Sequence, residues 1–277
     1  MKRVSVNGIE MAYEEHGAGT RPLLVVHGFT GSRRDFARCR DDLARLGRTI
    51  LPDLRGHGDS TNTGDAPTYT LAQLADDLVA FCDALGIASC DLLGHSMGGM
   101  AALRAALHAP ERFASLILMD TAAHAPAGIP RDTLALAGRI AIEAGTRKLV
   151  EIMRERAPNE PSRTAADRRL EARWGEGYWT EWRFPNFEAL DPVAYGAFGR
   201  AIVEQAPLAP RLAEIHCPTL VLVGAGDTSF LDAAAELAAG IPYARRVDVP
   251  DAGHQPQLEN PTAWLAAIRE HLRQVRG

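Results

Sequence analysis

Cysteine is scarce in this sequence, with four residues in 277 (Cys39, Cys82, Cys90 and Cys217), and none belongs to a CxxC pair. The first eight residues carry charge without a following apolar run, unlike a signal peptide. In a chain without a secretory signal, four buried thiols are expected rather than two disulfides. No window approaches the roughly 18 apolar residues that a membrane-spanning helix requires. We therefore expect a cytoplasmic protein with no membrane partner.

An excess of positive charge and the common cofactor motifs are also lacking. Lysine and arginine number 30 against 35 acidic residues, which gives a net charge of -5, and they are scattered along the chain. Binding to a phosphate backbone requires a basic face, so we expect no nucleic-acid partner. The sequence contains no HExxH, no P-loop and no dinucleotide-binding glycine pattern, and its histidines do not pair at ligand spacing. We expect neither a metal nor another cofactor.

Hydrophobic residues make up 46% of the chain, which is enough for one large core or for a core with a small inserted lid. Short apolar runs alternate along the sequence with segments of helical periodicity. This alternation is typical of a mostly parallel sheet that is covered by helices on both faces. The sequence therefore predicts an α/β fold.

The individual elements follow from local patterns. Asn7 and Gly8 separate two short extended segments and predict an opening hairpin. Thr70 is the expected N-cap of a helix, and Gln73 is placed to complete a capping box. Pro261 stands at a favourable first-turn position of a last helix. Strands are predicted at residues 4–6, 11–15, 23–26, 49–51, 90–93, 116–119, 220–223 and 246–249, and helices at 71–85, 97–107 and after 261.

Residues 121–217 differ from the rest of the chain. They lack strong apolar strand runs and are typical of several helices separated by prolines. We predict a helical lid inserted into a core domain that is formed by residues 1–120 and 218–277. The alternative is an extra helical layer with no gating role. Candidates for an aromatic pocket wall, and equally for packing of the lid on the core, are Trp174, Trp179 and Trp182.

A G-x-S-x-G pattern at residues 94–98 places Ser96 between a predicted strand and a predicted helix. A nucleophile on such a sharp turn sits in strained backbone, and small neighbours are needed where the chains crowd it. The following helix points its N-terminal N–H groups and its positive dipole end at a developing oxyanion. We therefore predict that Ser96 is a nucleophile; the alternative is a glycine-rich turn with an incidental serine.

Four motifs together resemble those of the α/β-hydrolase superfamily. They are the Gly-rich motif at residues 94–99, His-Gly-Phe at 27–29, Gly-His at 253–254 and the loop at 53–60, which resembles that of small esterases, lactonases and cofactor-free haloperoxidases. The motifs fall in the order of the family and span essentially the whole chain. The resemblance implies an α/β-hydrolase fold and a serine-dependent mechanism, and it is much less specific for the substrate.

A serine hydroxyl needs a base to accept its proton, and the sequence offers nine histidines for this role. The family order is serine, acid, histidine, and His254 follows the last predicted strand as that order requires. His271 comes later still, but we expect it to be a solvated residue of the last helix. His216 precedes a strand, at the sheet edge away from the site. We predict that His254 is the base.

The imidazole in turn needs a carboxylate to hold its tautomer. Asp227 follows the apolar run at residues 220–223, at the carboxyl end of a strand, where ligand chemistry gathers in α/β sheets. Asp120 also ends a strand, and some members of the family use that position. Asp251 is too close to His254 along the loop. We predict Asp227 as the acid, with Asp120 as the alternative.

The resemblance implies that the backbone amides of Phe29 and Met97 form the oxyanion hole. His95, next to the nucleophile, either contacts the substrate or packs in the turn. Arg55 and His57 are expected to fix the loop that carries them rather than to act in catalysis.

Together these features predict hydrolysis of a small-molecule carboxylic ester or lactone through an acyl-enzyme, by a monomer or a homodimer. Carbon–carbon bond hydrolases and the menaquinone-pathway lyase share the fold and remain an alternative. The hydrolases usually carry Asn and Trp where this chain has His95 and Gln255, and the lyase carries Arg in place of Met100. A ligand receptor that kept the fold without its chemistry is a second alternative.

Overall fold

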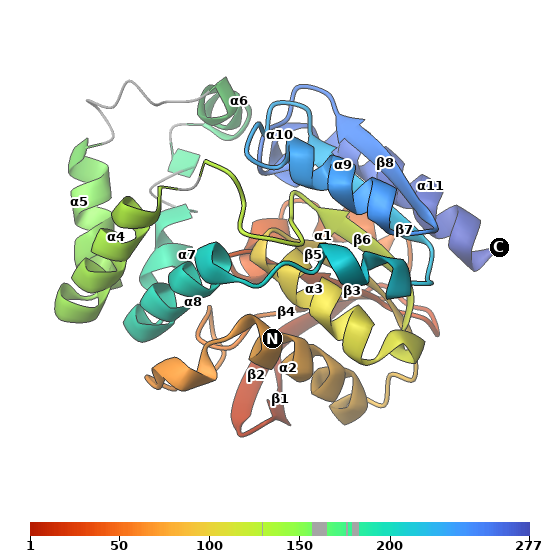
Figure 1. Ribbon diagram of the computed structural model, residues 1–277, viewed down its shortest axis with the longest axis horizontal. Coiled ribbons are helices and arrows are strands. Elements are labelled where there is room, and N and C mark those ends of the chain that lie inside the picture. Colours follow the sequence, from red (N-terminus) through yellow and green to blue (C-terminus); the bar gives the residue numbers. More distant parts are fainter. Residues whose placement is uncertain (129, 157–164, 176, 179–182) are drawn as a thin grey trace.

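The computed structural model describes the chain except for residues 129, 157–164, 176 and 179–182 (Figure 1). An eight-stranded sheet runs through it in the order β1-β2-β4-β3-β5-β6-β7-β8. The strands are β1 (Lys2–Val6), β2 (Ile9–His16), β3 (Leu23–Val26), β4 (Thr49–Pro52), β5 (Cys90–His95), β6 (Phe113–Met119), β7 (Thr219–Gly224) and β8 (Ala244–Val249). All eight predicted strands are therefore present.

The first strands form the predicted hairpin, in which β1 pairs antiparallel with β2. β2 also pairs antiparallel with β4, and from β4 onward each pair of neighbouring strands is parallel. Parallel strands require crossover connections, and the helices of the chain supply them. The predicted α/β fold with a mostly parallel sheet is thus confirmed.

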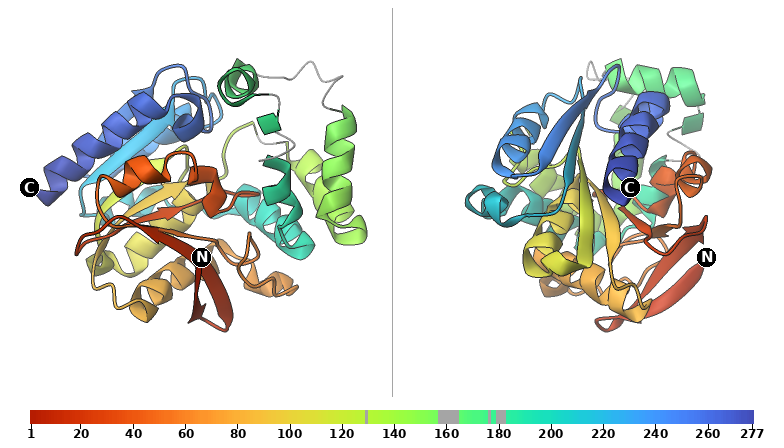
Figure 2. Two further views of the ribbon diagram at one scale, coloured as in Figure 1. Left: turned by 180° about the vertical axis from the view of Figure 1, so that it is seen from behind. Right: turned by 90° about the vertical axis from the view of Figure 1, so that its right-hand side faces the viewer.

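Helices cover both faces of the sheet (Figure 2). Side chains of β3 show why, because Leu24 and Val26 belong to one apolar cluster while Leu23 and Val25 belong to the other. Neighbouring residues of a strand point to opposite faces, so a continuous apolar run needs a cover on each side. One face is covered by α2 (Leu71–Ala84), α3 (Met97–His108) and α9 (Leu231–Gly240), and the other by α1 (Arg40–Ala44) and α11 (Pro261–Arg276).

The start of α2 confirms half of the predicted capping box. The Thr70 side chain accepts a hydrogen bond from the backbone N–H of Gln73 at 3.0 Å, as an N-cap should. The reciprocal bond is not made, because the Gln73 side chain donates instead to Asp77 Oδ1 at 3.0 Å. Asp77 is buried, and its carboxylate also accepts hydrogen bonds from Nε and Nη2 of Arg55, both at 2.8 Å. A hydrogen bond to a carboxylate is stronger than one to a neutral group, so Gln73 bonds to Asp77 rather than to the N-cap backbone. Arg55 thus fixes its loop, as predicted.

The chain between β6 and β7 forms the inserted helical region. Its helices are α4 (Arg131–Ala144), α5 (Thr146–Arg156), α6 (Ala165–Trp174), α7 (Phe184–Glu188) and α8 (Pro192–Glu204). Hydrogen bonds join Arg183 to Thr30, which follows β3, and Trp174 to Leu258 in α10 (Pro256–Glu259), which follows β8. The insertion therefore lies over the edge at which the parallel strands end.

Two local expectations were wrong. His271 is not solvated but 2% exposed on the inner side of α11, where burial lowers its pKa to about 4. Of the four cysteines, all of which are free thiols, Cys217 is only half-buried. Within the described part of the chain, none of the helices has the length and apolar character needed to cross a bilayer.

Candidate active site

Ser96 lies on the sharp turn between β5 and α3, with a backbone φ of 53° and ψ of -117°. A non-glycine residue in such a conformation costs on the order of 1–3 kcal/mol, which the surrounding packing must offset. The flanking glycines show how tight the turn is. A Cβ on Gly94 would lie 2.6 Å from the Gly98 carbonyl oxygen, and one on Gly98 would lie 2.4 Å from that of His27. The G-x-S-x-G pattern is therefore a steric requirement of this turn.

A chain of two hydrogen bonds links Ser96, His254 and Asp227. His254 lies in the loop between β8 and α10, with its Nδ1 2.6 Å from Asp227 Oδ2 and its Nε2 3.0 Å from Ser96 Oγ. A carboxylate can only accept, so Nδ1 carries the proton and Nε2 is left to accept the proton of the serine. Ser96 is 9% exposed, and the His254 side chain is 39% exposed. The three predicted residues thus meet in one hydrogen-bonded unit.

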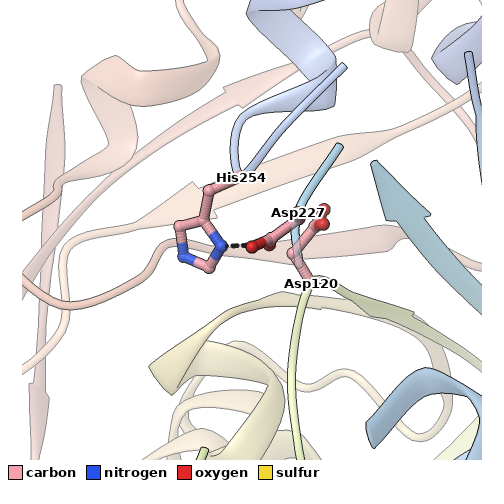
Figure 3. A group of neighbouring side chains, drawn as sticks. All are labelled: Asp120, Asp227 and His254. Carbon is pink, nitrogen blue, oxygen red and sulfur yellow. Dashed lines mark hydrogen bonds and ion pairs between the residues drawn. The ribbon is translucent and has the colours of Figure 1, made fainter. Parts of the chain in front are cut away.

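Asp120, the alternative acid of the sequence analysis, lies behind this unit rather than in it. Figure 3 shows Asp120, Asp227 and His254 converging from three separate segments of the chain. Asp120 directly follows β6 and is 1% exposed, and its Oδ1 accepts the backbone N–H of Gly224 at 2.9 Å. Burial, and after it the Asp227 carboxylate, raises the pKa of Asp120 well above its ordinary value. Asp227, not Asp120, therefore holds the imidazole in this structure.

These three side chains also offer one ligand atom each within 4.8 Å of one another, the kind of group that can hold a metal ion. Their existing contacts point elsewhere. His254 Nδ1 already pairs with Asp227 at 2.6 Å, and Nε2 already faces Ser96. Asp120 Oδ1 already accepts the Gly224 N–H, and the burial that raises the pKa of Asp120 disfavours the ionised carboxylate that metal binding requires. These hydrogen bonds account for His254, Asp227 and one oxygen of Asp120 without an ion.

The loop that carries His254 is held by a buried carboxylate that the sequence analysis missed. Glu259 is 3% exposed, and its two oxygens accept the backbone N–H groups of Gly253 at 2.8 Å and Gln255 at 3.0 Å, on either side of the histidine. Arg169 of the inserted region lies 3.2 Å from the same carboxylate. His95 adds a further contact, since its Nε2 donates to the His254 carbonyl at 2.8 Å. His95 therefore packs against His254, the predicted base.

If His254 is the base that the sequence predicts, a Glu259→Ala variant should lose about 10- to 100-fold in kcat, because small displacements of such a group weaken proton transfer steeply. The carboxylate fixes both neighbours of His254, and alanine leaves their N–H groups without an acceptor. The measurement is kcat on a p-nitrophenyl ester, with circular dichroism to show that the variant folds. Glu270→Ala, which removes an exposed carboxylate from α11, is the matched control and should behave like the parent chain. Equal kcat in the two variants would contradict the assigned role of Glu259.

The loop after β3 passes directly over Ser96. A Cβ on Gly28 would lie 3.0 Å from the Ser96 Cβ. His27 holds the loop, with its Nδ1 2.8 Å from the Gly28 carbonyl and its Nε2 accepting the Leu54 N–H at 2.9 Å. Among the described residues, no acceptor is bonded to the backbone N–H of Phe29 or of Met97, the first residue of α3. Both predicted oxyanion donors are therefore available to an incoming oxygen.

The inserted region is tied to this same loop by two of its side chains, Arg183 and Asn186, which carry no sequence signal. Arg183 donates to the Thr30 carbonyl at 2.8 Å and to Thr30 Oγ1 at 2.7 Å. Asn186 of α7 accepts from Ser32 Oγ and donates to Asp35 Oδ1, each at 3.0 Å. Because Thr30 follows Phe29 directly, the position of α7 and the position of the predicted oxyanion donor are coupled.

Asp35 gives this connection a measurable pH dependence. Burial raises its pKa from 3.8 to about 6, so between these values the folded chain binds a proton that the unfolded chain has lost. Rising pH therefore favours the unfolded chain through this window. Relative to an Asp35→Asn variant, the free energy of unfolding of the parent should fall by roughly 2 kcal/mol between pH 4 and pH 7. Urea unfolding of both proteins across this range measures the difference, and a difference that stays constant with pH would disprove the shift.

The aromatic candidates of the insertion divide into described and undescribed residues. The Trp174 Nε1–H donates to the Leu258 carbonyl at 2.9 Å, and the Arg38 guanidinium lies 4.3 Å from its ring. These contacts favour packing of the insertion on the core. Trp179 and Trp182 lie outside the described residues. Tyr195 of α8, which the sequence analysis did not single out, packs against Phe29 with ring centroids 5.0 Å apart.

A mostly parallel sheet with a serine on the turn between β5 and α3, and with helices inserted after β6, is the architecture of the α/β hydrolases. The chain belongs to this family, because the model of the alpha/beta hydrolase fold matches residues 21–261. The expected resemblance is thereby confirmed.

Individual relatives include hydrolases and an acyltransferase. An acetyltransferase component of the acetoin-cleaving system of Cupriavidus necator is 31% identical over 271 residues, which cover 96% of this chain and 67% of that protein. The structure of a thermophilic esterase from Thermogutta terrifontis, with malate bound, is 31% identical, covers 100% of this chain and 99% of its own, and has a TM-score of 0.82. An enol-lactonase from Burkholderia xenovorans aligns with the same TM-score of 0.82 at 24% identity, over 98% of this chain and 100% of its own, which supports the fold alone.

Proposed function

We propose that this α/β hydrolase cleaves carboxylic esters of small molecules, lactones included, through an acyl-enzyme on Ser96. The proposal rests on two hydrogen bonds of the His254 imidazole. Its Nδ1 lies 2.6 Å from Asp227 Oδ2, and its Nε2 lies 3.0 Å from Ser96 Oγ. Both are within the range in which a base accepts a proton directly. The esterase among the relatives supports an ester as the substrate.

In the proposed mechanism, His254 Nε2 takes the hydroxyl proton of Ser96 as Oγ attacks the ester carbonyl. The imidazolium that forms is stabilised by the Asp227 carboxylate at Nδ1. The free N–H groups of Phe29 and Met97 bind the tetrahedral oxyanion, and the positive end of the α3 dipole assists them.

Collapse of the tetrahedral intermediate breaks the ester bond. His254 returns its proton to the leaving alcohol, and the acyl group remains on Ser96 Oγ. A water molecule then enters, His254 accepts its proton, and the same two amides hold the second oxyanion. The acid is released and the serine recovers its proton, so the cycle needs no metal ion and no organic cofactor.

Labelling with a fluorophosphonate tests this proposal against a non-catalytic ligand receptor. An activated Ser96 should be labelled stoichiometrically, and labelling should vanish in a Ser96→Ala variant. Folded protein that takes up no label would contradict the proposal. A panel of p-nitrophenyl esters of graded chain length, several lactones and a ring-cleavage dienoate then separates ester hydrolysis from carbon–carbon bond cleavage.

A further inference from the structure

Asp120 has an unsatisfied oxygen next to the predicted catalytic acid. Its Oδ1 is bonded to the Gly224 N–H, whereas its Oδ2 is buried and has no partner among the described residues. The residue has a backbone φ of 45°, in the left-handed region. Burying a polar atom without a partner is costly, and so is a strained backbone at the same residue. An aspartate kept under these conditions calls for an explanation beyond packing.

We propose that Asp120 is a positioning residue that remains protonated and directs its Oδ2–H toward the Asp227 carboxylate, so that the two carboxyl groups share one proton behind His254. The inference rests on the function proposed above, since it describes how the acid of that mechanism is held.

Asp120 and Asp227 each have a carboxyl oxygen within 4.8 Å of the other's, and both residues are buried. Two such groups do not readily both ionise, because their repulsion and the loss of solvation favour one proton between them. The contacts decide which group keeps it. The charge of Asp227 is stabilised by the Nδ1–H of His254 at 2.6 Å, whereas Asp120 accepts only the Gly224 amide and is 1% exposed. The proton therefore belongs on Asp120, in agreement with its raised pKa.

The other charged groups around Asp120 reinforce this assignment. The charged groups that act on Asp120 are Asp227, in the loop after β7, and Glu259 of α10. The negative charge of each disfavours ionisation of Asp120. Arg169 of α6 forms an ion pair with Glu259 at 3.2 Å, so its charge is directed at that carboxylate. His254 is neutral at rest in the proposed mechanism. Among the residues that the structure describes, Asp120 thus has no cation of its own that would stabilise its ionised form.

Asp120 is also well placed to fix the geometry of the whole unit. It follows Met119, whose carbonyl accepts the Ser96 N–H at 2.9 Å, and precedes Thr121, whose Oγ1 donates to the Ser96 carbonyl at 2.7 Å. One short turn thus holds the backbone of the nucleophile from both sides. A hydrogen bond from Asp120 to Asp227 extends the same support to the acid.

An Asp120→Asn variant gives the sharpest test, because asparagine has the shape and charge of a protonated aspartate, offers an N–H donor and tolerates a positive φ. We expect its pH profile of kcat/KM to superimpose on that of the parent. If Asp120 is ionised in the parent, the substitution removes a negative charge near His254 and the acid limb moves by about one unit to lower pH. That shift would overturn the proposal.

An Asp120→Ala variant removes the donor. We expect kcat to fall about 10-fold with little change in KM, and the acid limb to move to higher pH, because the full charge of Asp227 then acts on the imidazolium. Asparagine at the same position should restore both. In an Asp227→Asn background, Asp120→Ala should cost no further activity, since it acts through the missing carboxylate. The inference would be wrong if Asp120→Ala had the kinetics of the parent. It would also be wrong if Asp120→Ala lowered the activity of the Asp227→Asn variant further.

The two proposals fail in different ways. If Ser96→Ala keeps its activity, the proposed function is wrong whatever Asp120 does. If Ser96→Ala is inactive while Asp120→Asn shows a shifted acid limb, only the inference about the shared proton is wrong.

Discussion

A Ser96→Ala variant is expected to lose on the order of 10⁴–10⁶ in kcat on an ester that the parent hydrolyses. Without Oγ no acyl-enzyme forms, and the remaining contribution comes from substrate binding and from the oxyanion donors alone. The loss corresponds to roughly 5–8 kcal/mol of transition-state stabilisation. KM should change little, because the hydroxyl contributes mainly to the transition state. Steady-state kinetics with purified protein, at high enzyme concentration for the variant, measures both constants.

Ser89→Ala is the matched control for this variant. Ser89 lies just before Cys90, at the opposite end of β5, so the substitution is identical and the strand is the same. Its kcat should equal that of the parent. Turnover by Ser96→Ala within tenfold of the parent would exclude an acyl-enzyme at this serine and would require a different mechanism.

An Asp227→Asn variant should lose about 10³–10⁴ in kcat. The amide lacks the charge that stabilises the imidazolium. It also no longer requires a proton on Nδ1, so His254 can adopt the tautomer in which Nε2 carries the proton and cannot accept one from Ser96. The geometry of the site should remain, because asparagine fills the same volume. Kinetics together with a thermal melt separates lost chemistry from lost folding.

Asp251→Asn provides the control for the acid. Asp251 is exposed, belongs to the same loop as His254 and has a φ of 52°, a conformation that asparagine tolerates. We expect it to keep the kcat of the parent. A similar loss in both variants would mean that the loop as a whole, and not the carboxylate at Nδ1, is sensitive to substitution.

Much of the fold is predictable because its signals are local. The strands β3, β6 and β7 are short, mostly apolar runs, and the Thr70 cap lies directly before the helix that it begins. The insertion is recognisable for the opposite reason, since it lacks strand runs. Local patterns fail where a contact depends on burial, which the whole fold determines. Gln73 turns away from the N-cap because Asp77 is buried and charged, and burial is a property of the whole fold.

His271 shows that an available signal can be overlooked. The buried residues of α11 are Trp264, Ala267, Ile268, His271 and Leu272. Their spacing of three and four residues marks one face of a helix, and His271 falls on it. Its polarity suggested a solvated position, whereas its place in the period predicts a buried one. The helical period therefore predicts the burial of His271 correctly.

The candidate site is predictable in its principal residues and not in their supports. Ser96 and His254 stand in motifs whose spacing has a mechanical reason, and in the structure His254 bonds to Ser96 through Nε2 and to Asp227 through Nδ1. Glu259 and Arg183 have no such motif. Their contacts with the loops at residues 253–255 and 30 arise only when segments far apart in sequence are folded together. Protonation of Asp120 likewise depends on burial and on a neighbour about a hundred positions away.

The helical insertion leaves the sheet after β6 and returns at β7, and these two strands are neighbours, with Met119 opposite Leu222. Ser96 lies before the insertion in the sequence, and Asp227 and His254 lie after it. Recombination between relatives can therefore replace the whole insertion while the reacting groups stay in register. A chimera built at these two points should keep its chemistry and change its choice of ester, provided that the donor segment brings its own counterparts of Arg183 and Trp174.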